Sequence, residues 1–196
     1  MVNKVIGLTG PIGSGKSTVT GMMVEQGLLE LAFATPVKIG LSKMLGIPLS
    51  LFEDRDSKEL IIEGLGVSPR DLMISLGHDW GRNAINGSLW IKILERELKQ
   101  HCFVDNNIVI SDVRYADEAD FVRKYGTLVH IDRPDIIRRD HESEAGVEFM
   151  PGDLAIVNHG SLDELREQVL WLTGTATGTR TGTVSQTVSV CSGALA

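Results

Sequence analysis

The segment Gly10–Ser17 (GPIGSGKS) constrains the fold of this 196-residue chain more than any other feature. It matches the pattern G-x-x-x-x-G-K-[ST], in which glycines let a loop curl until its backbone N–H groups point at phosphate oxygens. An apolar run, Val5–Thr9, precedes the loop, and a helical pattern, Gly15–Gln26, follows it. A chance glycine-rich turn is the alternative, and pattern and context together disfavour it. We therefore predict a P-loop that joins a buried strand to a helix.

The predicted P-loop supplies candidate ligands for ATP and for Mg²⁺. The Lys16 ammonium would reach the β- and γ-phosphates, and the Ser17 hydroxyl would coordinate the metal. The N-terminus of the following helix adds positive potential at the same place. The expected ATP-binding residues of this segment are Gly10, Ile12, Gly13, Ser14, Gly15, Lys16, Ser17 and Thr18.

Apolar runs alternate with helical patterns along most of the chain. The runs that predict strands are 5–9, 28–33, 107–111, 126–131 and 154–157. The segments that predict further helices are 36–45, 68–80, 88–100, 116–125 and 161–172. Strands separated by helices pair in parallel through crossover connections. We therefore expect an α/β fold: a P-loop NTPase with a parallel five-stranded sheet covered by helices on both faces.

Composition limits the class of protein. With 42% hydrophobic and 23% charged residues, the chain resembles an ordinary globular protein with one core. A formal net charge of −7 argues against a general nucleic-acid binder. Neither an export signal nor a membrane-spanning apolar run is evident. Two cysteines, Cys102 and Cys191, are too few for a disulfide framework, so we expect a cytoplasmic protein that binds neither nucleic acid nor membrane.

A second candidate site follows the predicted strand at 107–111. Asp112 would lie at the carboxyl edge of the sheet beside the P-loop, where its carboxylate could hold Mg²⁺ or contact a substrate. Arg114 would bind a phosphate bidentately. The alternative is a solvated turn that carries an Asp–Arg surface pair.

The paired arginines Arg138 and Arg139 lie in a polar segment at about 134–150. Arginines in a lid neutralise charge on a migrating phosphoryl group, so both are candidate catalytic residues together with Lys16 and Arg114. A solvated charged helix is the alternative. Residues 173–196 are rich in Thr and Gly, and they predict either a flexible tail or an added edge strand.

The helical segment at about 36–104 would be an insertion that binds the phosphoryl acceptor. Its candidate substrate ligands are Lys38, Arg70, Trp80 and Arg82, to which Asp112 and Arg114 are added from the sheet edge. Trp80 and Trp90 offer flat faces for a base, although tryptophans in such helices are commonly core residues. With the insertion and the lid, residues 1–172 would form one P-loop domain.

Two resemblances follow from these motifs. The segments GLTGPIGSGKSTV and VNHGSLDELREQV resemble dephospho-coenzyme A kinase. That family carries an Asp-Ala-Asp segment where this chain has 33–38, and a Leu-Leu-Phe-Glu type segment where this chain has 111–114. The catalytic aspartate that a sugar-hydroxyl acceptor requires is not located here.

The fuller resemblance is to phage-type (T4-like) deoxynucleoside monophosphate kinases, with a shorter insertion between Glu53 and Pro69. The matching segments, in order, are the P-loop, FATPVK, SPRDLMISLGHDWGR, Trp90, SDVRYADEADFVRKYGTLVHIDRP, DHESEAG and GDLAIVNHGSLDEL. The resemblance implies ATP, Mg²⁺ and a deoxynucleoside monophosphate acceptor, and host cytoplasm if the protein is phage-encoded. It also implies that Asn158 and Gly160 lie near the ATP adenine. On spacing alone they form a turn before a helix capped by Ser161 and Glu164.

These patterns predict in-line transfer of the γ-phosphoryl group to a deoxynucleoside monophosphate. Lys16, Mg²⁺ and the lid arginines would neutralise charge, while Arg70 and Arg114 hold the acceptor. Kinases of other small molecules, such as dephospho-coenzyme A, are one alternative, and a P-loop nucleotide switch without an acceptor is another. The oligomeric state is left open, with a homodimer as one option.

Overall fold

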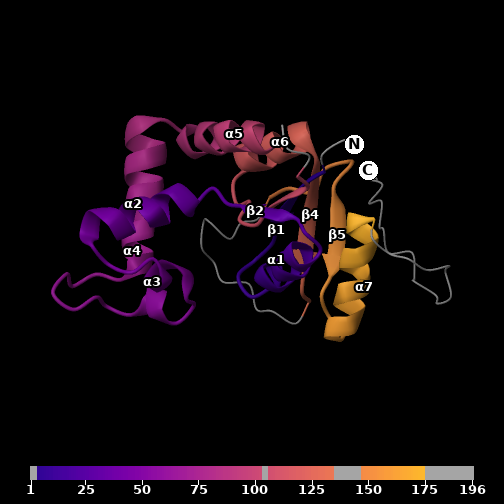
Figure 1. The fold of residues 1–196 in the computed structure, drawn as a ribbon, viewed down its shortest axis with the longest axis horizontal. Helices are drawn as coiled ribbons and strands as arrows, with labels where there is room; N and C mark the ends of the chain where they lie inside the picture. The colour runs from indigo at the N-terminus through magenta and orange to yellow at the C-terminus, as the bar shows by residue number, and fades with distance from the viewer. Residues whose placement is uncertain (1–3, 103–105, 135–146, 175–196) are drawn as a thin grey trace, which may run out of the picture. The chain divides into compact units, whose positions relative to one another are not determined.

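The computed structural model of the chain describes residues 4–102, 106–134 and 147–174 (Figure 1). The strands are β1 (Val5–Thr9), β2 (Leu29–Leu31), β3 (Ile108–Ile110), β4 (Thr127–Asp132) and β5 (Leu154–Val157). The helices are α1 (Lys16–Glu25), α2 (Thr35–Leu45), α3 (Ser50–Glu53), η1 (Ser57–Glu59), α4 (Pro69–Ile74), η2 (Ser75–Ile85), α5 (Leu89–Cys102), α6 (Ala116–Tyr125) and α7 (Leu162–Thr173). They form two compact units. Met1–Glu30 and Asn106–Ala196 make the first unit, and Leu31–Asp105 makes the second.

The sheet has the strand order β2-β3-β1-β4-β5, with β1 at its centre. β1 pairs in parallel with β3 on one side and with β4 on the other, and β4 pairs in parallel with β5. The P-loop therefore leaves the middle strand of the sheet. The five-stranded parallel sheet that the sequence predicts is confirmed.

Helices cover both faces of the sheet. Ile6 and Leu8 are fully buried in the cluster formed with α1 and α7, which also includes Val19, Met22 and Met23 of α1. Gly7 points to the opposite face, because side chains alternate along a strand. A Cβ on Gly7 would lie 2.6 Å from Val122 Cγ1 of α6. Thus α6 packs closely on one face, and α1 and α7 pack on the other (Figure 1).

A buried ion-pair network fixes the segment before β5. The Asp153 carboxylate accepts hydrogen bonds from Arg123 Nε at 3.0 Å and Arg123 Nη2 at 2.7 Å. It also accepts one from the Met150 N–H at 3.0 Å, and His130 Nε2 lies 3.0 Å from Oδ2. Asp120 contacts the same guanidinium from the exposed side at 3.0 Å. Residues from α6, β4 and the segment before β5 are thereby joined.

The second unit is helical, and its helix ends follow the expected chemistry. Gly46 ends α2 in a left-handed conformation with φ 68°. Ser68 and Asp71 form a capping box at the start of α4, and Pro69 occupies the first turn. The helix predicted at 68–80 begins as expected with α4, but it gives way after Ile74 to an eleven-residue π-helix, η2, which extends to Ile85.

Other boundaries move by one or a few residues. The strand predicted at 28–33 shortens to Leu29–Leu31 because its neighbour β3 offers three residues for pairing. Ala32 and Phe33 are buried beyond the strand, which explains the longer apolar run. The 175–196 part of the predicted tail and the 135–146 part of the predicted lid lie outside the described residues. Within the described ranges, no helix is long and apolar enough to cross a membrane.

Candidate active site

The P-loop requires glycine at three positions with left-handed backbone conformations: Gly10 (φ 145°), Gly13 (φ 82°) and Gly15 (φ 103°). Two of them also face close neighbours. A Cβ on Gly10 would lie 2.4 Å from the Ile131 carbonyl oxygen, and one on Gly15 would lie 2.3 Å from Asn158 Nδ2. The loop is therefore packed against β4 and against the segment that follows β5.

Lys16 lies against the loop that precedes it. Its Nζ donates hydrogen bonds to the carbonyl oxygens of Gly10 at 2.5 Å and Pro11 at 2.8 Å. Across the described part of the chain, no side chain caps the N-terminus of α1 at Gly15. The first amide groups of α1 and the ammonium of Lys16 therefore make a positive concavity of the kind that binds phosphate.

Asn158 joins the loop after β5 to the P-loop. Its Nδ2 donates to the Ser14 carbonyl oxygen at 2.8 Å, and its backbone N–H donates to the Asp132 carbonyl oxygen at 2.7 Å. The sequence did not reveal this contact, since residue spacing carries no information about partners so distant. The predicted capping box of Ser161 and Glu164 is confirmed at the start of α7. Whether Asn158 and Gly160 lie near the adenine stays a prediction.

Asp112 and Arg114 follow β3 at the same edge of the sheet as the P-loop. Val113 is buried between them, and its N–H donates to the Leu8 carbonyl oxygen at 3.2 Å. Glu118, itself 4% exposed, accepts hydrogen bonds from the N–H groups of Arg114 at 2.9 Å and Tyr115 at 3.2 Å. Glu118 therefore holds the turn that carries Arg114. The sequence patterns did not single it out, although an acid in the first turn of a helix was a usable signal.

The oxygen donors near the P-loop fit a magnesium ion carried by a nucleotide. The Ser17 side chain is exposed on the first turn of α1, and Asp112 is half-buried after the neighbouring strand. Mg²⁺ usually keeps several waters and takes few protein ligands beside substrate phosphates. The described residues contain no group of three or more His, Cys, Asp or Glu that could hold a metal ion.

The predicted acceptor ligands of the second unit lie on three helices. Lys38 is half-buried on α2, and Arg70 lies on α4 with its Nε 2.6 Å and its Nη2 2.5 Å from Oε1 of Glu59. Trp80 and Arg82 are both on η2, and the Trp80 side chain is 49% exposed. Arg138 and Arg139 lie outside the described residues.

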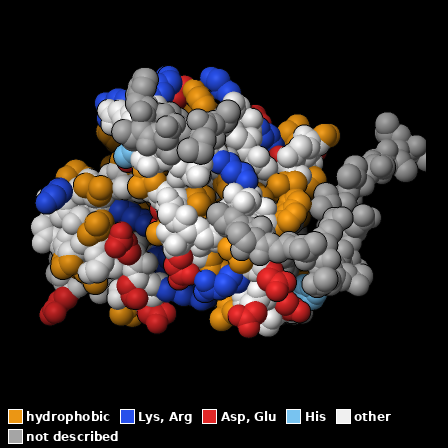
Figure 2. All heavy atoms as spheres, turned by 45° about the vertical axis from the view of Figure 1, so that its right-hand side comes forward, with side chains coloured by type: hydrophobic (Ala, Val, Ile, Leu, Met, Phe, Trp, Pro, Cys, Tyr) orange, Lys and Arg blue, Asp and Glu red, His pale blue; other side chains and the backbone are white. Residues whose placement is uncertain are grey.

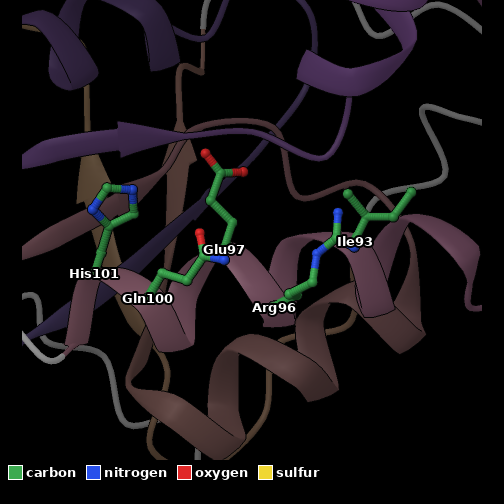
Figure 3. A pocket seen from close by; sticks show the side chains of 5 residues that line it. All are labelled: Ile93, Arg96, Glu97, Gln100 and His101. Atoms are coloured by element: carbon green, nitrogen blue, oxygen red, sulfur yellow. The ribbon is translucent and has the colours of Figure 1, made fainter.

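A separate shallow pocket runs along α5. Its lining side chains are Ile93, Arg96, Glu97, Gln100 and His101 (Figure 3). All five come from one helix, and Arg96 and Glu97 bring opposite charges. None of the predicted site residues lines it, so it does not define a second active site.

A P-loop on the central strand of a parallel five-stranded sheet, with a helical unit inserted after β2, defines the class of P-loop kinases. Within this class, the chain belongs to the deoxynucleotide monophosphate kinase family, whose model matches residues 55–169.

Relatives agree with this assignment, and a solved structure shares the fold. The chain is 28% identical over 186 residues to a putative deoxynucleotide monophosphate kinase of Acanthamoeba polyphaga mimivirus, covering 85% of this chain and 94% of that protein. It is 34% identical over 105 residues to the deoxynucleotide monophosphate kinase of Enterobacteria phage T4, covering 52% of this chain and 44% of that protein. Dephospho-CoA kinase from Campylobacter jejuni shares the fold, with a TM-score of 0.50 and 14% identity over 87% of this chain and 95% of its own.

Proposed function

We propose that this protein transfers the γ-phosphoryl group of ATP to the phosphate of a deoxynucleoside monophosphate, giving ADP and a deoxynucleoside diphosphate. The observation that carries the proposal is the P-loop geometry at Lys16, in a chain that belongs to the deoxynucleotide monophosphate kinase family. P-loop geometry of this kind in a family member supports the donor half of the proposed reaction.

The donor phosphates would bind at the P-loop amides and at the N-terminus of α1. Lys16 would exchange its contacts with the loop carbonyls for the β- and γ-phosphate oxygens. An oxygen of the acceptor phosphate then attacks the γ-phosphorus while the bond from that phosphorus to the β–γ bridging oxygen breaks. Because the attacking phosphate is already an anion, the step requires no general base. Catalysis is therefore positioning together with electrostatic stabilisation.

Ser17 and Asp112 are the residues that would hold Mg²⁺ or its waters. When bound, the metal ion supplies further neutralisation of charge on the β- and γ-phosphates. Few protein ligands would be needed here, because Mg²⁺ usually keeps several waters and binds beside substrate phosphates.

The acceptor phosphate would be held by arginines. Glu59 engages Nε and Nη2 of Arg70, so the Nη1 group presents two further donors in a fixed orientation. Arg114, exposed at the sheet edge, would hold the acceptor from the P-loop unit. Lys38 and Arg82 are additional cations of the helical unit, and Trp80 provides an exposed ring for stacking on a base. The hypothesis assigns lid functions to Arg138 and Arg139 from the sequence alone.

Charge distribution favours small anionic substrates over a nucleic acid. On the face shown in Figure 2, acidic and basic side chains are interspersed. The formal net charge is −7, so long-range attraction to a polyanion would be weak. A few local arginines are sufficient for one or two phosphate groups.

A substrate panel tests the proposal. The protein is incubated with ATP and Mg²⁺ and with single deoxynucleoside monophosphates, ribonucleoside monophosphates or dephospho-coenzyme A, and products are separated by chromatography. The expected product is a deoxynucleoside diphosphate. Turnover of dephospho-coenzyme A alone would contradict the acceptor assignment, and slow ATP hydrolysis that ignores every acceptor would indicate a nucleotide switch instead.

A further inference from the structure

The helix η2 is unusual in its length. π-helical geometry occurs mostly as single turns inside α-helices, often at functional sites. Here it continues for eleven residues, Ser75–Ile85, and closes with a hydrogen bond of 3.0 Å from the Asn86 N–H to the Gly81 carbonyl oxygen. A backbone form that chains rarely adopt persists only when its surroundings stabilise it.

Trp90 of α5 provides that stabilisation. Its Nε1 donates a hydrogen bond of 2.7 Å to the carbonyl oxygen of Gly77, and its side chain packs against Gly81, one helical turn further on. A Cβ on Gly81 would lie 2.4 Å from Trp90 Cζ2, 2.7 Å from Cε2 and 2.8 Å from Nε1. The indole therefore lies directly on the backbone of η2, and Trp90 is only 8% exposed.

The same contact sets the orientation of the candidate acceptor ligands. Gly81 stands between Trp80 and Arg82 in the chain, so the residue held against the indole is flanked by both. Gly81 is buried, whereas the ring of Trp80 is 49% exposed. If η2 turned about its axis or converted to an α-helix, the directions of Trp80 and Arg82 would change together.

We infer that Trp90 is a positioning residue for the acceptor. Its contacts with Gly77 and Gly81 fix η2 so that Trp80 and Arg82 face the base and phosphate of the monophosphate. The inference rests on the proposed function, because it needs the acceptor to bind at η2. Trp90 itself does not touch the acceptor. It acts through the backbone of η2.

Two glycines in the same helix provide a matched test. Gly81→Ala forces the indole out of its seat, whereas a Cβ on Gly77 would meet only Val37 side-chain carbons, at 3.7 and 3.9 Å. Both changes replace glycine by alanine in η2, so their effects on intrinsic helix preference are alike. We expect Gly81→Ala to raise the KM for the deoxynucleoside monophosphate about tenfold or more, as misplacement of substrate-positioning groups does. The KM for ATP should stay within about twofold, and Gly77→Ala should resemble the wild type in both.

Trp90→Phe is the milder second variant, since it keeps an aromatic ring and removes the N–H donor. We expect about a threefold rise in the calorimetric Kd for the monophosphate, measured without ATP, and an unchanged Kd for ATP. If Gly81→Ala shows a reduced helical circular dichroism signal, the test rests on Trp90→Phe instead. If the wild-type protein makes the deoxynucleoside diphosphate, either of two results would overturn the inference. One is an unchanged Kd for the monophosphate in Trp90→Phe, and the other is equal KM values for the monophosphate in Gly81→Ala and Gly77→Ala. Absence of deoxynucleoside diphosphate from the wild-type protein would instead contradict the proposed function.

Discussion

The side-chain amide of Asn158 donates a 2.8 Å hydrogen bond to the backbone carbonyl of Ser14, 144 residues earlier in the chain. The bond ties the loop after the outermost strand β5 to the middle of the phosphate cradle. Ser14 is fully buried, and the next residue, Gly15, approaches Asn158 so closely that no side chain fits between them. The P-loop is therefore held by the contact with Asn158 as well as by its own backbone.

Asn158→Ala should weaken ATP binding, because the P-loop loses one of its external supports. We expect about a fivefold rise in the Kd for ATP, equivalent to the loss of one ordinary hydrogen bond. Binding of a fluorescent ATP analogue measures it. Gln168→Ala is the control, since it removes a side-chain hydrogen bond to the Val157 carbonyl oxygen without touching the P-loop. Equal Kd values for the two variants would contradict the role of the Ser14 contact.

Glu118→Ala should loosen the turn that carries Arg114. The carboxylate holds the N–H groups of Arg114 and Tyr115, and its removal leaves both donors without this acceptor. We expect the KM for the deoxynucleoside monophosphate to rise several-fold, with little change in the KM for ATP. Steady-state kinetics with each substrate varied in turn separate the two constants.

Glu118→Gln is the matched variant, because glutamine keeps one acceptor oxygen while it replaces the other with an NH2 group and removes the charge. It should retain most of the affinity for the monophosphate. A KM for ATP that rises as much as that for the monophosphate would show that Glu118 supports the P-loop unit as a whole.

The Asp153 network predicts a pH-dependent stability. Burial acts to raise the pKa of Asp153, but hydrogen bonds from Arg123, the Met150 N–H and His130 outweigh it and hold this pKa below the ordinary value of 3.8. The stabilisation is therefore complete above that value and is lost as pH falls through the lowered pKa. Urea unfolding of the wild type should show a steeper loss of unfolding free energy than Asp153→Asn does as pH falls below about 4.

At neutral pH, Asp153→Asn should reduce the free energy of unfolding by about 3 kcal/mol, since it leaves Arg123 without its buried partner. Asp120→Asn removes the exposed carboxylate from the same guanidinium and should cost less than about 1 kcal/mol. Similar losses in the two variants would mean that burial of the pair contributes little.

Lys16→Ala should reduce kcat at least about a hundredfold, because the ammonium stabilises charge on the transferred group. The fold should be retained, since the Nζ contacts to the carbonyl oxygens of Gly10 and Pro11 lie within the P-loop itself. Rapid-quench kinetics at saturating ATP measure the effect, and circular dichroism checks the fold. A variant that turns over at the wild-type rate would remove Lys16 from the catalytic step.

The sheet was predictable from the sequence because its strands are short, apolar and separated by clear helical patterns. The run at 154–157 and the helix at 116–125 match the structure at both ends. The P-loop was equally visible, since glycine, lysine and serine are each required at fixed spacing. The helix cap at Ser161 followed from local hydrogen-bonding chemistry.

The π-helix η2 and the contact of Asn158 with Ser14 were not predictable in the same way. The segment from 68 to 80 carries an ordinary helical pattern, and the indole of Trp90 that packs on the backbone of η2 comes from the next helix. Likewise, Asn158 lies in a polar turn whose partner is fixed only once β1 and β5 enter one sheet. Tertiary contacts decided both features, and single-sequence patterns do not encode them.

Following the γ-phosphoryl group itself tests the central claim most directly. The protein is mixed with Mg²⁺ and ATP labelled at the γ-phosphorus, with and without a deoxynucleoside monophosphate, and the label is traced by chromatography. The account predicts that the label appears in the deoxynucleoside diphosphate, in an amount that depends on the monophosphate. Label released as inorganic phosphate at the same rate with or without the monophosphate would contradict it.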